Sequence, residues 1–425
     1  MVAWLEWVSS TGKMRTHQLR ALLAMAGIVN VVHGCTTVLA HVVDGPTVVG
    51  RTMEFGIPYL KSELEQIYLH ARGTPVGIAH GKHYNVSKFG YLAVQVAIAS
   101  ISPGTFSSTE GINEAGLTVS AQIHEGASYH PDDGSMPTTI YDVQATAFLL
   151  ACCKTVDEAA SALASVRVVA TPLLGNIGAL HWSVQDASGA SRAFEFVNQE
   201  LRVYDNTEVG VLTNDPGYEW HMGHLNFYAD YPTTATNPGF HPTVTSSGPF
   251  STSSVIVPGD GSGITTTTAP VYHGHGLNTR GLPGGYSPPD RFIKMFLLKQ
   301  TAVSHAPPKS LDEGIIMITG LLNTVHIARG TVTAGYGGSK ILARTPEYTN
   351  WACIKVPWAS QQNSTATANP RGSSGPIFLY RTYDNMQWRR IELGRIDFSI
   401  GNTFAPIALY EPGLGIKDVT PRRKL

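Results

Sequence analysis

Short runs of β-branched and aliphatic residues recur along the chain and predict strands joined by turns. The first run, residues 35–43, is followed by Asp44-Gly45-Pro46 and a second run, residues 47–51, a pattern typical of a β-hairpin. Further strands are expected at residues 91–100, 117–123, 180–185, 193–197 and 209–212, and from Ile377 onward. Turn residues separate many of these runs, which favours antiparallel pairing.

Three stretches predict helices. Residues 139–151 follow a Pro-Thr-Thr start, and residues 155–163 open with Thr155 as a cap and an acidic first turn. The third, residues 289–298, begins with Pro-Asp-Arg. Because paired strands alternate with helices, we expect antiparallel sheets covered by helices, in the α+β class.

Composition narrows the function classes. The chain has 425 residues, 43% of them hydrophobic and 14% charged, which is globular and not disordered. Its formal net charge of -1 gives no basic field for nucleic acid, so we expect no nucleic-acid partner. Residues 232–276 are rich in Thr, Ser, Pro and Gly, and are expected to form a long loop-like excursion.

The cysteines signal neither a disulfide framework nor a metal site. Cys35, Cys152, Cys153 and Cys353 show no CxxC pair or regular spacing. Cys152 and Cys153 end an apolar stretch and are interpreted as small buried helix residues. Elsewhere, His273-Gly-His275 lacks a nearby third ligand, so we predict no metal and no organic cofactor.

The segment before Cys35 has the pattern of a secretory signal. A basic stretch follows Met14, an apolar run covers residues 21–32, and His33-Gly34-Cys35 comes next. We therefore expect residues 1–34 to be removed, with Met14 as the natural start, and the mature protein to be secreted or periplasmic. The apolar run is too short to span a bilayer, so no stable membrane anchor is expected. A buried N-terminal helix and a lipid-modified Cys35 are the alternatives.

A cysteine exposed by such cleavage can act as nucleophile and base in one residue. The new α-amine has a reference pKa of roughly 7.7–8.0, so it can accept the proton of its own thiol. Arg51 and Glu54 stand in an otherwise apolar strand that is predicted to pair with the Cys35 strand. The guanidinium favours a thiolate and the carboxylate can orient the amine, although periodicity by itself also fits a surface ion pair.

At this level of detail the chain resembles the choloylglycine hydrolase family, which includes bile salt hydrolases and penicillin V acylases. The motifs that carry the resemblance run in family order across nearly all of residues 35–425: Cys35-Thr-Thr, Gly50-Arg-Thr-Met-Glu-Phe, Glu110-Gly-Ile-Asn-Glu-Ala-Gly-Leu, His181-Trp with Asp186-Ala-Ser-Gly, Gly210-Val-Leu-Thr-Asn-Asp-Pro, Gly281-Leu-Pro-Gly-Gly-Tyr-Ser-Pro-Pro-Asp-Arg-Phe and Tyr380-Arg-Thr-Tyr-Asp-Asn. The resemblance implies one N-terminal-nucleophile (Ntn) hydrolase domain over residues 35–425, a four-layer αββα sandwich. It also implies a homo-oligomer, commonly a tetramer.

The resemblance also implies roles for individual residues. Cys35 matches the nucleophile, and Arg51 and Arg291 match two active-site arginines. Asn214 matches the side-chain donor of an oxyanion hole, and the backbone N–H of Ile123 matches its second donor. Glu54 departs from the family, which usually has Asp there, and Gly285 stands where Asp is frequent.

The resemblance further implies hydrolysis of a small N-acyl amide. Ile123 carries an apolar side chain where bile salt hydrolases tend to have Asn. The sequence therefore favours penicillin V or an N-acyl homoserine lactone as the substrate over conjugated bile salts. A secreted binding protein that has lost catalysis is the alternative from another class, and Glu54 and Gly285 are the residues that favour it.

Overall fold

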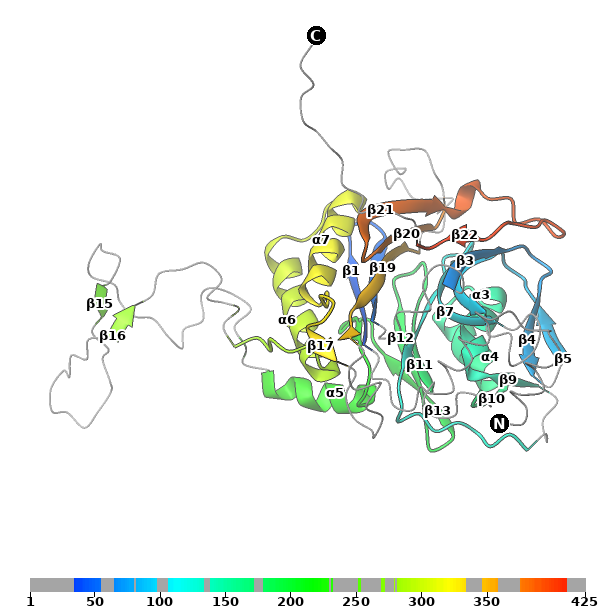
Figure 1. Cartoon of the computed structure of the whole chain (residues 1–425), viewed down its shortest axis with the longest axis horizontal. Coiled ribbons are helices and arrows are strands. Elements are labelled where there is room, and N and C mark those ends of the chain that lie inside the picture. The colour runs from blue at the N-terminus through cyan, green and yellow to red at the C-terminus, as the bar shows by residue number, and fades with distance from the viewer. Residues whose placement is uncertain are drawn as a thin grey trace, which may run out of the picture.

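The computed structural model describes residues 34–54, 65–79, 82–97, 106–133, 138–171, 179–228, 231, 251–253, 269–271, 279, 281–333, 346–357 and 375–410. Two large antiparallel sheets pack face to face, and a pair of helices covers the outer face of each sheet (Figure 1). The predicted α+β sandwich is confirmed. The predictions for residues 1–33, and for most of residues 232–276 with His273 and His275, lie outside the described residues.

The first large sheet contains the predicted hairpin of Cys35. Its strand order is β14-β1-β2-β19-β20-β21. Cys35 lies opposite Met53 at one end of the β1–β2 pair, and His41 lies opposite Thr47 at the turn. The strands are β1 (Cys35–His41), β2 (Thr47–Glu54), β14 (Val211–Leu212), β19 (Thr349–Val356), β20 (Ile377–Thr382) and β21 (Asn385–Glu392).

The second large sheet faces the first across the centre of the molecule. Its strand order is β13-β12-β11-β8-β7-β6-β3-β22. The strands are β3 (Glu65–His70), β6 (Tyr91–Ala97), β7 (Phe106–Asn113), β8 (Thr118–Ile123), β11 (Leu180–Gln185), β12 (Ser191–Val197), β13 (Glu200–Asp205) and β22 (Ile407–Ala408). β8 and β19 are buried at nearly every position because both faces of each large sheet are covered.

Helices α6 (Pro288–His305) and α7 (Leu311–Thr324) cover the first sheet, and α3 (Ala145–Cys152) and α4 (Val156–Ala164) cover the second (Figure 1). The predicted cap is confirmed, since the Thr155 hydroxyl accepts the N–H of Glu158 at the start of α4. Ser287 and Ser310 cap α6 and α7 in the same way.

The structure differs from the sequence prediction in several elements, among them the strands β3, β7, β13 and β19, which were not predicted. The helix predicted from Thr139 begins at Ala145, because residues 139–141 are extended as β9 and pair with β10. β-Branched Thr139 and Ile140 suit a strand better than a helix. The helices α5 (Tyr218–Leu225) and α7 were not predicted, although the Ser310–Glu313 spacing that caps α7 is a recognised start signal.

Smaller elements complete the described part of the chain. They are β4 (Pro75–Ala79), β5 (Lys82–Val86), β9 (Thr139–Tyr141), β10 (Arg167–Val169), β15 (Ser251–Ser253), β16 (Ala269–Val271), β17 (Val332–Thr333), β18 (Pro346–Glu347) and the 3-10 helices η1 (Asp142–Gln144), η3 (Asn226–Tyr228) and η6 (Leu393–Arg395). Among the helices described, none is both long and apolar enough to cross a membrane.

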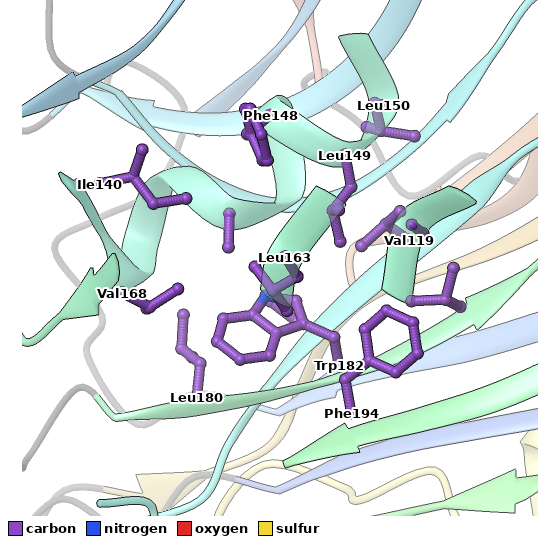
Figure 2. Close-up of a cluster of buried hydrophobic side chains, with 14 of the residues drawn as sticks. Val119, Ile140, Phe148, Leu149, Leu150, Leu163, Val168, Leu180, Trp182 and Phe194 are labelled. Carbon is purple, nitrogen blue, oxygen red and sulfur yellow. The ribbon is translucent and has the colours of Figure 1, made fainter. Parts of the chain in front are cut away.

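Three apolar clusters hold the four layers together. The largest lies between the second sheet and α3 and α4, where Trp182 and Phe194 meet Leu149 and Leu163 (Figure 2). A second joins the first sheet to α6 and α7. The third fills the space between the sheets and contains Trp351. Truncating a buried aromatic such as Trp182 to alanine typically costs about 3–5 kcal/mol. The hairpin is held by the second cluster, to which Val38 and Val48 belong.

Candidate active site

Cys35 begins β1 and is buried, with 1% of its surface exposed. Its side chain enters the space between the two sheets. The thiol Sγ lies 3.5 Å from Met53 Sδ and 3.4 Å from the guanidinium Nη2 of Arg51. Strand register explains this contact: Arg51 lies opposite Thr37, two residues along β1 from Cys35, so both side chains share one face of the hairpin.

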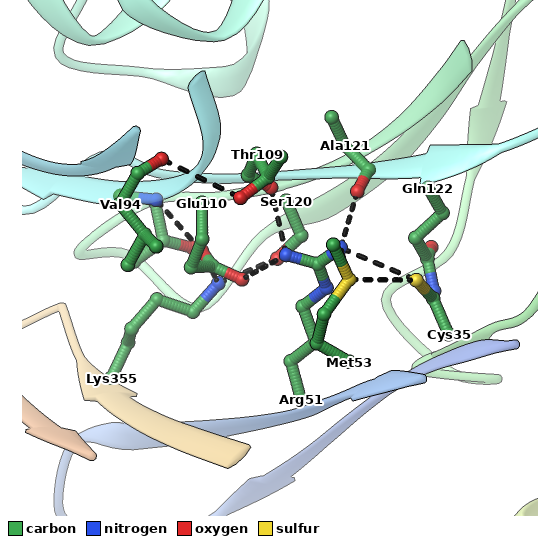
Figure 3. A network of polar contacts seen from close by, with 12 residues as sticks. Cys35, Arg51, Met53, Val94, Thr109, Glu110, Ser120, Ala121, Gln122 and Lys355 are labelled. Atoms are coloured by element: carbon green, nitrogen blue, oxygen red, sulfur yellow. Dashed lines mark hydrogen bonds and ion pairs between the residues drawn. The ribbon is translucent and has the colours of Figure 1, made fainter. Parts of the chain in front are cut away.

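Arg51 is held by the opposite sheet. Its Nη2 donates to the carbonyl of Ala121 at 2.5 Å, and its Nη1 donates to the carbonyl of Thr109 at 2.7 Å. Figure 3 shows the guanidinium between these carbonyls and the thiol. Burial by itself disfavours the charged form of Arg51, but its electrostatic interactions with Glu110 and with the ionised form of Cys35 raise its pKa.

A buried ion network continues from Arg51 away from the thiol. Glu110 Oε2 lies 3.4 Å from Arg51 Nη1, and its Oε1 accepts from the ammonium of Lys355 at 2.6 Å. Lys355 also donates to the Ser120 hydroxyl at 2.6 Å. All three charged side chains are 0% exposed (Figure 3). This network links β2, β7 and β19 behind the nucleophile.

Arg291 approaches Cys35 from the other face of the hairpin. It lies in the first turn of α6, and its Nη1 donates to the Cys35 carbonyl and to the Thr36 hydroxyl, each at 2.6 Å. Its Nη2 donates to Asn214 Oδ1 at 2.8 Å. Burial lowers the pKa of Arg291, opposed by the charges of Glu54 and Cys35. The helix therefore delivers a cation to the backbone side of the nucleophile.

Asn214 joins the nucleophile to the second sheet. Its Oδ1 accepts the backbone N–H of Cys35 at 2.7 Å, and its Nδ2 donates to the carbonyl of Ile123 at 2.8 Å. The N–H and C=O of one residue in an antiparallel strand point to the same side. The Ile123 N–H therefore faces the side on which Asn214 lies. The two predicted oxyanion donors are brought together beside Cys35.

Glu54 lies on the Arg291 side of the hairpin, three residues beyond Arg51 and so on the opposite face of β2. Its backbone N–H donates to the Gly34 carbonyl at 2.7 Å, and its Oε1 accepts from the Thr349 hydroxyl at 2.8 Å. Burial raises the pKa of Glu54 to about 7, against the opposing effects of Arg291, Thr52 and Thr349. Glu54 thus binds the residue before Cys35 through its backbone, and its carboxyl lies on the face opposite Arg51 and the thiol.

Burial raises the pKa of the Cys35 thiol above its usual range. The cations Arg51 and Arg291 oppose this effect, and Glu54 adds to it. The buried thiol is therefore protonated in the chain that still carries Gly34. A base must remove its proton before attack. The nitrogen of Cys35 cannot do so while it forms an amide with Gly34, because an amide N–H only donates hydrogen bonds.

The structure brings all six predicted site residues together around one strand end. Two residues at this centre were not predicted. Glu110 lies in one of the motifs that resemble the family, and Lys355 is a lone charge in the apolar run 351–356. A charged residue inside a fully buried strand is a signal for a buried partner.

Three further side chains near the site have the composition of a metal cluster. The ligand atoms of His124, His181 and Glu195 lie within 4.8 Å of one another. However, His181 Nδ1 lies 2.8 Å from Glu195 Oε1 and its Nε2 lies 2.7 Å from the Thr213 carbonyl. Both ring nitrogens of His181 are thus engaged in hydrogen bonds within the protein. His181 instead fixes the backbone next to Asn214.

Comparison with known proteins adds a family match. The model of the linear amide C–N hydrolases, choloylglycine hydrolase family, matches residues 35–265 and 267–355. A bile salt hydrolase/transferase of Clostridium perfringens is 27% identical over 289 residues, which cover 67% of this chain and 72% of that protein.

Solved structures agree on the fold. A cysteine-to-alanine variant of the conjugated bile acid hydrolase from Clostridium perfringens aligns with a TM-score of 0.66 and 23% identity, over 91% of this chain and 99% of that one. Penicillin V acylase from Agrobacterium tumefaciens aligns with a TM-score of 0.58 and 18% identity, over 87% and 89% of the two chains. At these identities the likeness supports the Ntn-hydrolase sandwich.

Proposed function

Because the chain belongs to the choloylglycine hydrolase family of linear amide C–N hydrolases, enzymes of EC 3.5.1 type, we propose that Cys35 is the nucleophile of this hydrolysis. The observation that carries the proposal is that three side chains converge on this one cysteine. Arg51 lies 3.4 Å from its Sγ, Asn214 lies 2.7 Å from its backbone nitrogen and Arg291 lies 2.6 Å from its carbonyl oxygen. The family match also begins at Cys35.

The proposed reaction starts after residues 1–34 are removed. The freed α-amine of Cys35 takes the thiol proton, and the sulfur attacks the carbonyl carbon of the substrate amide. The oxyanion that forms is held by Asn214 Nδ2 and the N–H of Ile123. The ammonium then protonates the leaving amine as the C–N bond breaks, and water hydrolyses the resulting thioester. Glu54 orients the amine throughout.

Arg51 and Arg291 have different electrostatic roles in this mechanism. Arg51 touches the sulfur and favours negative charge there, whereas Arg291 binds the carbonyl of Cys35 and the oxygen of Asn214. By holding Asn214 Oδ1, Arg291 directs the amide nitrogen of Asn214 toward Ile123. This orientation is the one that an oxyanion donor requires.

For the substrate we propose conjugated bile salts as the first class. The relative and the structure with the higher similarity are named for bile salt and conjugated bile acid hydrolysis. An N-acyl amide of the penicillin V or N-acyl homoserine lactone kind is the second class. The apolar side chain of Ile123, which is partly buried next to the oxyanion site, favours this class.

One preparation tests both parts. The mass of the purified protein shows whether its N-terminus is Cys35, and amine release from taurocholate, glycocholate, penicillin V and an acyl homoserine lactone gives the substrate. We expect hydrolysis by the chain that starts at Cys35 and none by Cys35→Ala. An active protein that retains Gly34, or activity in Cys35→Ala, would refute the mechanism. A preference for penicillin V would refute the bile salt assignment and leave the mechanism intact.

A further inference from the structure

The formal charges of the buried side chains behind Cys35 do not sum to zero. Arg51 and Lys355 contribute two positive charges and Glu110 contributes one negative charge, all at 0% exposure. One positive charge is left over in the interior. A buried charge without a counter-charge is unfavourable, so the site gains free energy when a negative charge forms nearby.

The geometry indicates where that negative charge belongs. Glu110 is 2.6 Å from Lys355 but 3.4 Å from Arg51, so the lysine takes most of the carboxylate. The terminal N–H groups of Arg51 otherwise point at two carbonyls, at Cys35 Sγ, 3.4 Å away, and at the thioether of Met53, 3.5 Å away. Carbonyls and a thioether are neutral, which leaves Cys35 Sγ as the group in this shell that can become an anion.

Among the described contacts, no hydrogen bond or ion pair joins Arg51 to the other titratable groups near this network. Cys353 lies opposite Arg51 in β19, and burial, with Glu110 second, raises its pKa well above the usual range. Glu65 is bound by Trp351 Nε1 at 3.0 Å and by the Tyr410 hydroxyl at 2.8 Å, and burial raises its pKa. Glu54 and Arg291 lie on the other face of the hairpin.

We propose that Lys355 is a positioning residue for the nucleophile: by binding Glu110 it leaves the charge of Arg51 free to hold the Cys35 thiolate. Without Lys355, Glu110 would pair with Arg51 alone and cancel its charge. Lys355 acts through Glu110 and Arg51, without contact with the substrate. The proposal rests on the proposed role of Cys35 as nucleophile.

The test measures the thiol directly and needs no substrate. The purified protein is treated with iodoacetamide between about pH 5 and about pH 10, and the alkylation rate of the Cys35 peptide is followed by mass spectrometry. Lys355→Met removes the positive charge and is expected to raise the midpoint of the alkylation curve by about one pH unit. Glu110→Gln removes the negative charge and is expected to lower it.

The double variant Glu110→Gln/Lys355→Met restores one net positive charge and is expected to return the midpoint close to the wild-type value. Lys299→Met is the matched control, since Lys299 is a buried lysine whose ammonium binds the carbonyls of Glu208 and Val209. It lies near Leu39 of β1, about 13 Å from Cys35 at about 3.3 Å per strand residue. The midpoint of the alkylation curve of Lys299→Met should equal that of the wild type.

Opposite shifts in the two single variants are the signature of a charge effect. If both midpoints move in the same direction, or if Lys355→Met leaves the curve unchanged, the proposal is wrong. Where one single variant does not fold, the other and the double variant still give the sign. If the variants show these shifts but the wild-type protein hydrolyses none of the four substrates tested, the proposed function is refuted and this inference is supported.

Discussion

Replacing Asn214 by aspartate changes one group of the proposed oxyanion hole. The new carboxylate keeps the shape of the side chain and still accepts from Cys35 N–H and from Arg291, which now lie 2.7 and 2.8 Å from Oδ1. It cannot donate, so the bond from Nδ2 to the Ile123 carbonyl at 2.8 Å is lost. Loss of one oxyanion donor costs about 3–4 kcal/mol, a decrease in kcat of about 10²–10³-fold.

The assay compares kcat, KM and thermal stability of Asn214→Asp with those of the wild type. We expect kcat to fall and KM to stay within a few-fold, because the donor acts mainly in the transition state. Asn113→Asp is the control, since Asn113 is a buried asparagine whose Nδ2 binds the carbonyls of Leu150 and Cys153 away from the site. It should lose stability and keep kcat. A kcat of Asn214→Asp within tenfold of wild type would refute the assignment of Asn214.

Three more predictions follow from buried groups. Burial raises the pKa of Asp142 to about 7 from 3.8, so the folded protein holds a proton that the unfolded chain has lost, and stability should fall by about 4 kcal/mol as pH rises from about 4 to about 7 through this group. Urea unfolding of Asp142→Asn across this range should show a smaller fall than the wild type, and an equal fall would contradict the argument. In Gly50→Ala the new Cβ would lie 2.4 Å from Ile318 Cγ2 of α7, so calorimetry should show a loss of about 1–3 kcal/mol, whereas Gly320→Ala, with open space around it, should be neutral or stabilising. Glu54→Asp withdraws the carboxylate from Thr349 and should lower kcat by about tenfold; a gain in kcat would show that the longer side chain is a defect.

Local sequence signals predicted the hairpin that carries the site. The Asp44-Gly45-Pro46 turn between two β-branched runs indicated the pairing, and the pairing set the register that brings Arg51 to the face of Cys35. The same local reasoning failed for Thr139–Tyr141, where a helix start signal was outweighed by pairing with residues 167–169. Pairing between distant segments overrides local propensity because the ladder is completed by tertiary structure.

The ion network could not be predicted from local patterns. Glu110 and Lys355 are separated by 245 positions, and their contact depends on two sheets packing at one register. In the sequence, Lys355 is a charged residue within a strand that is otherwise apolar. This pattern indicates that Lys355 has a buried partner, but it does not identify the partner. Arg291 was assigned through family resemblance for the same reason, since it meets Cys35 across 256 positions.

The alternation of side chains along β2 separates two requirements of an N-terminal nucleophile. The thiol must lose its proton, and the α-amine must remain neutral enough to accept one. A cation close to both atoms would favour the thiolate but would also lower the basicity of the amine. In this chain Arg51 lies on the inner face with Sγ, whereas on the outer face the carboxyl of Glu54 offsets the charge of Arg291, which binds the Cys35 carbonyl. Because Arg51 and Glu54 are three apart on one strand, the pleat itself puts the carboxyl of Glu54 on the face opposite the thiol. Moving the carboxylate by one position would put it on the thiol side, where it would oppose the thiolate.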